Sequence, residues 1–297
     1  MKTQTGVTIE TDAPISTWFG VGGGADRLAR PVTVEELIEC VRIDPDLRVL
    51  GDGANLLVDD AGVGELVVDL SGGVFRDVAF EEESGRVFVG GGARLPKLIN
   101  ECVRRGLGGL ERLAGIPASV GGAVIMNAGG AFGQVCDHVA RVHAIDRAGR
   151  EHAFDRSQID FGYRRSRLNH LIVYGVEFRL ERGDPAALRE EQKRCMAYKK
   201  ETQPLADDSA GCVFKNPTLA SAIEGVGGAG ERVSAGMLID RAGLKGERVG
   251  GARVSDRHAN FIVTDEGARA RDVIELISVI AERVEARFGV RLEREVV

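Results

Sequence analysis

The sequence predicts an α+β protein with more than one domain. Its 297 residues correspond to two domains, or three small ones, at about 150 residues per domain. Short extended runs bounded by glycine are interspersed with helices that carry one apolar face. Forty glycines stand against eight prolines, which indicates tight turns and close backbone approaches rather than a flexible linker. We therefore expect ligand sites that are lined by backbone.

The first predicted block, residues 1–72, contains mostly short strands. Extended runs lie at 48–50, 56–58 and 65–70, and they are separated by glycine-rich turns. A helix that begins near Val34 interrupts them.

The second block, residues 73–183, is also mostly sheet. A strand is expected at 86–89, and the helix at 95–105 has its apolar residues on one face. A hairpin turn follows at 146–149, and a further strand spans 171–180.

The third block, residues 184–289, begins after a Gly-Asp-Pro turn with a charged helical segment at 186–200. A helix capped by Ser234 and a strand around 260–264 follow. The last residues, 290–297, alternate between apolar and charged, which predicts a strand with Glu295 on its charged face. The long helix before that strand is expected to bury one stripe: Ile274, Ile277, Ala281, Val284 and Phe288.

Composition and charge exclude several functions. The net charge is −6 and no long basic run occurs, so we expect no nucleic-acid partner. No window approaches 18 uninterrupted apolar residues, so we expect a soluble, cytoplasmic protein without a membrane partner. Five cysteines without a C-x-x-C motif and five histidines without ligand spacing predict neither disulfides nor a metal site.

Three glycine-rich segments are candidate nucleotide-binding loops. Residues 20–25 match G-x-G-x-x-G/A, but Pro31 closes the segment too soon for the required helix, so we interpret them as a structural turn. Residues 51–56 lie between two apolar runs and could form a nest of N–H groups for a phosphate, although a plain hairpin is equally consistent. Residues 115–123 could pack backbone against a diphosphate or a flat ring, or form a buried turn. Two such loops together favour a dinucleotide.

Three side chains are candidates for chemistry, each with an ordinary alternative. Arg164, within FGYRRS, could bind an anion or be a solvated surface cation. Cys212, ahead of Lys215 and Asn216, could be a reactive thiol or a small buried apolar residue. Glu295 could line a cleft or simply face water.

Eight segments in order resemble the UDP-N-acetylenolpyruvoylglucosamine reductase family over nearly the full length. They are Thr17-Trp18-Phe19 with Gly22-Gly23, LGDGANLLV, AGIPASVGGAVIMNAG, FGYRRS, SAGCVFKNP, AGMLIDRAGLKG, VSDRHANFIV and LEREV. The resemblance implies a two-part FAD-binding domain of the vanillyl-alcohol-oxidase (PCMH) type over 1–72 and 73–183. It implies a substrate-binding domain over 184–289, and a strand at 290–297 that returns to the active-site cleft.

The resemblance also implies the chemistry. NADPH reduces FAD, and reduced FAD delivers a hydride from N5 to the enol ether of UDP-N-acetylglucosamine enolpyruvate, a step of peptidoglycan precursor synthesis. Arg164 and a protonated or proton-sharing Glu295 would stabilise the charge that moves onto the substrate carboxylate. Cys212, where the family usually has serine, would protonate the enol intermediate.

Residue by residue, the resemblance assigns the binding sites. The 48 positions between Arg164 and Cys212 are too few for the inserted tyrosine-bearing loop of some members, so we infer the loop-less subtype. We expect a monomer. The substrate would be met by Tyr163, Lys200, Lys215 and Asn216, and FAD by Gly51, Asp52, Gly53, Ala54, Asn55, Leu56, Gly115, Ile116, Pro117, Ala118, Ser119, Gly121, Gly122 and Asn127.

Three other functions were weighed against this one. An FAD-dependent oxidase of the same superfamily would share the cofactor loops but has no reason to contain SAGCVFKNP and LEREV. A binding protein that has lost catalysis is suggested by the cysteine at the serine position. A cysteine hydrolase using Cys212 and His258 would leave both glycine loops unexplained.

Overall fold

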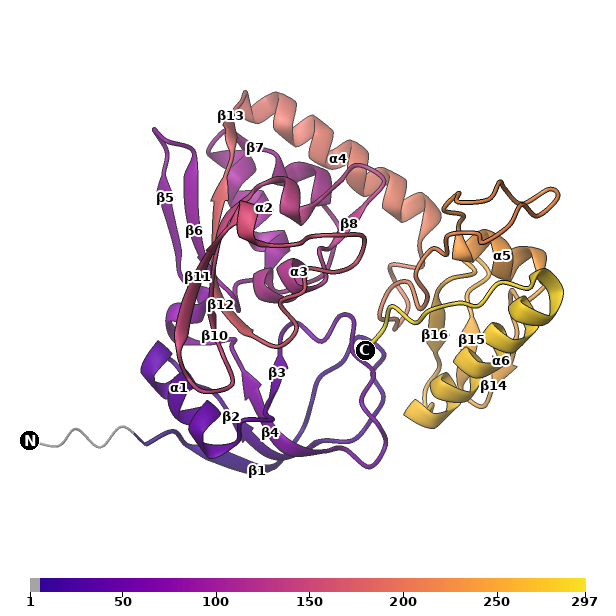
Figure 1. Ribbon diagram of the computed structural model, residues 1–297, viewed down its shortest axis with the longest axis horizontal. Coiled ribbons are helices and arrows are strands. Elements are labelled where there is room, and N and C mark those ends of the chain that lie inside the picture. Colours follow the sequence, from indigo (N-terminus) through magenta and orange to yellow (C-terminus); the bar gives the residue numbers. More distant parts are fainter. Residues whose placement is uncertain (1–5) are drawn as a thin grey trace, which may run out of the picture. The chain divides into compact units, whose positions relative to one another are not determined.

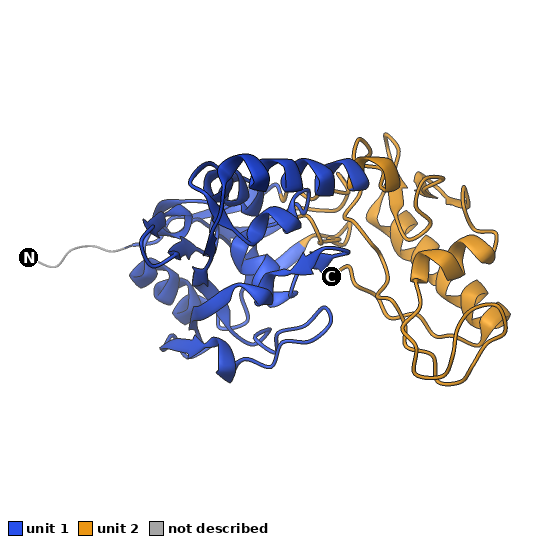
Figure 2. Cartoon of the chain, turned by 90° about the horizontal axis from the view of Figure 1, so that it is seen from above, with its two compact units in different colours: residues 1–14, 25–52, 63–198 blue, residues 15–24, 53–62, 199–297 orange. Residues whose placement is uncertain are grey.

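A computed structural model describes residues 6–297, which form two compact units (Figure 2). The first unit comprises 1–14, 25–52 and 63–198, and the second comprises 15–24, 53–62 and 199–297. The predicted ranges 1–72 and 73–183 therefore fall largely in one unit. The change of unit near residue 198 lies inside helix α4 (Pro185–Thr202), not at the predicted turn before it.

A four-stranded sheet opens the first unit. Its order is β1-β2-β4-β3, in which β1 and β2 are antiparallel and the other two pairs are parallel (Figure 1). Helix α1 (Val34–Ile43) begins where the Thr33 side chain accepts a hydrogen bond from the Glu36 N–H, as an N-cap does. It buries Leu37 and Cys40 against this sheet. The strands are β1 (Ile9–Ala13), β2 (Ala25–Ala29), β3 (Arg48–Leu50) and β4 (Val63–Asp69).

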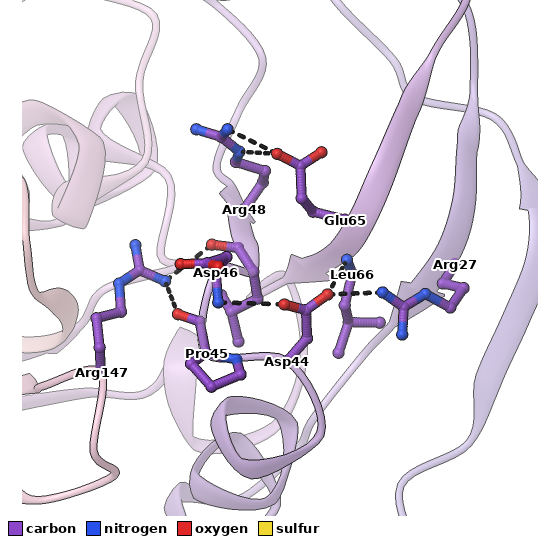
Figure 3. Close-up of polar contacts among 9 residues, drawn as sticks. Arg27, Asp44, Pro45, Asp46, Arg48, Glu65, Leu66 and Arg147 are labelled. Carbon is purple, nitrogen blue, oxygen red and sulfur yellow. Dashed lines mark hydrogen bonds and ion pairs between the residues drawn. The ribbon is translucent and has the colours of Figure 1, made fainter.

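A polar cluster joins the end of α1 to this sheet (Figure 3). The Asp44 carboxylate accepts hydrogen bonds from the Leu66 N–H at 2.9 Å and from the Arg27 guanidinium at 2.6 Å. Arg147 donates to the Leu47 carbonyl at 2.8 Å from the hairpin that the sequence predicted at 146–149. The segment that follows α1 is thus held to the sheet and to the hairpin by hydrogen bonds.

The second sheet of the first unit is antiparallel throughout, with the order β11-β10-β12-β6-β5. The predicted strands at 86–89 and 171–180 are confirmed as β6 and β12. The strands are β5 (Val78–Glu81), β6 (Arg86–Gly90), β10 (Val139–Ile145), β11 (Glu151–Asp155) and β12 (Ile172–Arg179).

Two helices, α2 (Leu95–Arg104) and α3 (Val120–Ile125), share one hydrophobic core with this sheet. The apolar face that the sequence predicted for α2 is confirmed, because each of its five members is buried. Short two-stranded pairs complete the unit: β7 (Leu107–Gly108) with β13 (Glu181–Arg182), and β8 (Gly129–Gly130) with β9 (Gly133–Gln134).

The second unit contains an antiparallel sheet in the order β14-β15-β16 and two helices that share its hydrophobic core. Ser234 caps α5 as predicted, since its side chain accepts a hydrogen bond from the Met237 N–H at 3.2 Å. Between residues 6 and 297, no helix is both long and apolar enough to cross a membrane. The elements are α5 (Ala235–Arg241), β14 (Arg248–Val249), β15 (Ala252–Val254), β16 (Ile262–Thr264) and α6 (Ala270–Phe288).

Helix α6 buries a stripe that overlaps the predicted one: Ile277 and Val284 are buried, Ala281 and Phe288 pack partly buried against the same core, and Ile274 is exposed. Ile274 is 38% exposed, whereas Val273, Leu276 and Ile280 are buried together with Ile277 and Val284. Val273 and Ile274 each lie three or four residues before Ile277, so the apolar pattern alone does not show which of the two is buried.

The strands predicted at 56–58 and 290–297 are not formed. Residues 290–297 form a single isolated β-bridge, between Arg294 and Phe214, although Leu292 and Val296 are buried as the alternation required. The run at 56–58 forms no strand. Alternation predicts which side chains are buried, while a ladder also needs a partner segment along its length.

Candidate active site

The first unit brings Gly51 against the second predicted loop. A Cβ on Gly51 would lie 2.4 Å from Ser119 Oγ, so only glycine fits there without displacing Ser119. Ser119 caps α3, because its Oγ accepts from the Gly122 N–H at 3.2 Å. Beside it, Arg94 forms an ion pair with Asp52 at 3.0 Å. The start of the first glycine loop and the second loop are thus in contact at Gly51 and Ser119.

Gly91 and Gly92 also make close backbone contacts, and neither was among the predicted site residues. The Gly121 N–H donates to the Gly91 carbonyl at 2.7 Å, and a Cβ on Gly92 would lie 1.7 Å from the Leu70 carbonyl oxygen. Three consecutive glycines between a strand and a helix were the available signal, because they indicate close backbone contact.

Asn127 is buried and serves a neighbouring loop. Its Nδ2 donates to the Gly162 carbonyl at 2.9 Å and to Gln134 Oε1 at 3.0 Å, while its Oδ1 accepts from the Cys136 N–H at 3.2 Å. The side-chain amide of Asn127 therefore holds the start of the FGYRRS turn.

That turn presents Tyr163 and Arg164 at its tip. Gly162 and Arg165 exchange two backbone hydrogen bonds of 2.9 and 3.2 Å, which closes a tight hairpin around the two tip residues. Arg164 has φ +54, a left-handed conformation that is uncommon for a residue with a side chain. Its guanidinium carbon lies 5.2 Å from the centre of the Tyr163 ring. Such conformations cluster at functional sites.

The second unit places Cys212 and Glu295 on neighbouring backbone segments. The Glu295 N–H donates to the Val213 carbonyl at 2.7 Å, and the Lys215 N–H donates to the Glu293 carbonyl at 2.8 Å. Cys212 and Glu295 are 83 positions apart in the sequence. Glu295 donates the first of these hydrogen bonds, and Cys212 immediately precedes Val213, which accepts it. The structure therefore brings together the two catalytic residues that were predicted in this unit.

Asn260 fixes the other side of the Cys212 segment. Its Nδ2 donates to the Phe214 carbonyl at 2.7 Å, and its Oδ1 accepts from the Phe214 N–H at 3.0 Å. Its own carbonyl accepts from the Val213 N–H at 2.8 Å. His258 accepts from the Asn260 N–H, and burial lowers the pKa of this histidine, which favours the neutral ring. Sequence analysis did not single out Asn260, because nothing local marks this contact.

The predicted substrate-binding residues have varied surroundings. Lys215 Nζ forms an ion pair with Glu293, and Asn216 Oδ1 accepts from the N–H of Ala235 at the start of α5. Lys200 is exposed near the end of α4. No group of three metal-ligating side chains occurs within residues 6–297.

The predicted loop at 51–56 is divided between the two units. Gly51 and Asp52 belong to the first unit, whereas residues 53–56 belong to the second. In the second unit Asn55 Nδ2 donates to the Glu295 carbonyl at 3.0 Å. The segment at 20–25 opens no helix, as expected, because strand β2 begins at Ala25.

Comparison with known proteins identifies a family for each of two ranges of the chain. Residues 25–155 match a family described as an FAD binding domain, and 203–297 match the C-terminal domain of UDP-N-acetylenolpyruvoylglucosamine reductase. The reductase of Syntrophobacter fumaroxidans is 42% identical and aligns with 94% of this chain and 80% of its own length. The Moorella thermoacetica reductase is 40% identical over 99% of this chain and 94% of its own. The crystal structure of the Thermus caldophilus reductase (MurB) has 39% identity, covers 98% of both chains and gives a TM-score of 0.79.

Proposed function

This chain belongs to the UDP-N-acetylenolpyruvoylglucosamine reductase family, and on that premise we propose which of its residues carry out the reaction. It is an FAD-dependent oxidoreductase with NADPH as electron donor, and it reduces UDP-N-acetylglucosamine enolpyruvate in peptidoglycan precursor synthesis. Its fold is the predicted one, a vanillyl-alcohol-oxidase-type FAD-binding domain with the C-terminal domain of the reductases. Bound FAD supplies the hydride at N5.

The residues at the predicted cofactor loops fit FAD. Gly51 lies against Ser119 with no room for a Cβ, and glycine-rich backbone of this kind can offer N–H groups to an anionic diphosphate. We assign the diphosphate to the backbone of residues 51–56 and 115–122, with the Ser119 hydroxyl beside it. Asn127 contributes by holding the turn at Gly162.

Arg164 and Glu295 would stabilise the negative charge that develops on the substrate carboxylate as its β-carbon gains a hydride. A guanidinium offers two parallel N–H donors to a carboxylate, and a tight hairpin holds its backbone in place. Glu295 contributes in its protonated form, as a hydrogen-bond donor to the same carboxylate. Tyr163 lies beside the Arg164 guanidinium and limits its freedom.

Cys212 would donate the proton that completes the reduction at the α-carbon. A thiol is more acidic than the serine hydroxyl found in most relatives, so a cysteine can fill this role. The observation that carries the assignment is the hydrogen bond from the Glu295 N–H to the Val213 carbonyl, because it fixes Glu295 next to the segment of Cys212.

Substrate phosphate contacts, location and assembly complete the proposal. Lys200, Lys215 and Asn216 would meet the substrate, and the two lysines would serve its diphosphate. The protein would act as a monomer in the cytoplasm, as a member of the loop-less subtype. The acidic net charge of −6 disfavours a nucleic-acid partner.

An anaerobic experiment with the purified protein tests the proposed function. NADPH is added to bleach the flavin absorbance near 450 nm, and UDP-N-acetylglucosamine enolpyruvate is then added. We expect the oxidised spectrum to return at a rate that matches steady-state turnover. A protein that is bleached by NADPH but not reoxidised by this substrate would contradict the proposal.

A further inference from the structure

Residues 295–297 pair with the second half of the loop at 51–56. The Val297 N–H donates to the Asn55 carbonyl at 3.1 Å, and the Leu57 N–H donates to the Val297 carbonyl at 2.8 Å. One residue bonded in this way to both neighbours of position 56 is the pattern of parallel strands. The terminal segment and this loop are therefore joined by one parallel pair of backbone hydrogen bonds.

Two residues earlier in the terminal segment, at Glu295, a side chain takes the place of the next backbone hydrogen bond. In a parallel ladder, the Glu295 carbonyl would accept from the main-chain N–H of residue 55. Here it accepts from Asn55 Nδ2 instead, at 3.0 Å. The Glu295 N–H meanwhile donates to the Val213 carbonyl at 2.7 Å. Both peptide groups that flank the Glu295 side chain are thus held, one from each side.

We propose that Asn55 is a positioning residue for Glu295, an inference that rests on the proposed role of that glutamate. Its amide fixes the main chain of Glu295. Asparagine suits this task because it combines a short side chain with two N–H donors. Alanine has no donor, and aspartate would direct a second acceptor at the Glu295 carbonyl oxygen.

Measuring the two half-reactions separately distinguishes this role of Asn55 from a general structural role. Asn55→Ala and Asn55→Asp are compared with wild type by stopped-flow absorbance, first with NADPH and then with UDP-N-acetylglucosamine enolpyruvate. Quenching of flavin fluorescence gives the affinity for FAD. Gln192→Ala is the matched control, since it removes another amide hydrogen bond, to Asn100, elsewhere in the chain.

Because the diphosphate is assigned to the main chain of residue 55 and not to its side chain, we expect both Asn55 variants to retain FAD and to lose less in reduction by NADPH than in reoxidation by the substrate. Reoxidation by the substrate should slow by about 10- to 100-fold, because small misplacements of a catalytic group carry penalties of that size. The aspartate variant should be slower than the alanine variant, and the control should match wild type. Wild-type reoxidation in both Asn55 variants, or an equal loss of FAD binding and of both half-reactions, would overturn the proposal.

A double variant distinguishes this proposal from the role of Glu295 itself. If Asn55 acts through Glu295, adding Asn55→Ala to Glu295→Gln should slow reoxidation by less than about threefold more. Fully multiplicative effects would overturn the positioning role and leave the role of Glu295 intact. A wild-type rate in Glu295→Gln alone would overturn the role of the glutamate, and the role of Asn55 with it.

Discussion

Cys212 differs from the other four cysteines in its exposure. Cys40, Cys102, Cys136 and Cys195 are each at most 4% exposed, whereas Cys212 is only partly buried. Burial also raises the thiol pKa of Cys40 to about 11 and that of Cys102 to about 12, so these two hold almost no thiolate at neutral pH. Reactivity toward alkylating reagents should therefore concentrate at one position.

We predict that iodoacetamide at pH 7.5 modifies Cys212 first in the native protein. Peptide mapping by mass spectrometry at increasing times should show this residue labelled before any other, with parallel loss of turnover. The Cys212→Ser protein, in which the buried thiols are unchanged, should take up label much more slowly. Equal labelling of a buried cysteine would contradict the exposure described here.

Single residues also show where sequence reasoning reaches its limit. Arg164, Cys212 and Glu295 could be named because the motifs around them are distinctive, even before any contact was known. Asn260 and the side chain of Asn55 could not be assigned their contacts in this way. The bond between Asn55 and Glu295 joins residues 240 positions apart, and no local pattern carries that information.

Helix α6 provides a direct test of its buried face. Leu276 is fully buried, while Ile274 is 38% exposed. We predict that Leu276→Ala lowers the free energy of unfolding by about 2–5 kcal/mol through the cavity it leaves. Ile274→Ala, the matched change at an exposed position of the helix, should shift it by less than about 1 kcal/mol. Urea denaturation of both variants measures the difference, and equal losses would contradict the assigned face.

Local elements were predicted best where a single arrangement fits the pattern. Helix α2 has one apolar face, and the structure buries it as predicted. Helix α6 has two adjacent apolar positions, 273 and 274, so its face depended on the sheet it packs against. The terminal segment 290–297 alternates as a strand would, but its partners at Val213 and Asn55 come from distant parts of the chain.

The division of the whole chain into units was the least predictable feature. Segments 15–24 and 53–62 belong to the second unit although they lie within the first 72 residues. Composition shows no boundary around them, because membership of a unit is decided by long-range contacts such as that of Asn55 with Glu295. Turns in the sequence therefore cannot show which segments belong to which unit.

Acid should weaken the fold through its hydrogen-bonded carboxylates. The pKa of Asp44 is lowered first by the N–H of Leu66, and the pKa of Asp272 first by the N–H of Gly251. Because the folded pKa lies below the unfolded value of about 3.9, each group stabilises the protein above that pH and loses its contribution as pH falls.

We predict that Asp44→Asn lowers the free energy of unfolding at pH 7 by about 1 kcal/mol. The difference from wild type should shrink as the pH falls below about 4 and through the lowered pKa of folded Asp44, where the wild-type carboxylate becomes protonated as well. Urea titrations at pH 7, 4 and 3 measure this trend, with the exposed Asp77→Asn as a control expected to change little. A difference that grows toward low pH would contradict the account.

The central claim is that Arg164, Cys212 and Glu295 act on the substrate and not on reduction by NADPH. The most direct measurement compares wild type with Arg164→Ala, Cys212→Ala and Glu295→Gln in anaerobic stopped-flow experiments. Flavin reduction by NADPH should stay within a fewfold of wild type in all three. The Arg164 and Glu295 variants should reoxidise at least about 100-fold more slowly with UDP-N-acetylglucosamine enolpyruvate, the size of effect typical of removing one stabilising donor. The Cys212 variant should lose steady-state product formation, and Cys212→Ser should restore it. Wild-type reoxidation in the Arg164 and Glu295 variants, or wild-type turnover in Cys212→Ala, would contradict the claim.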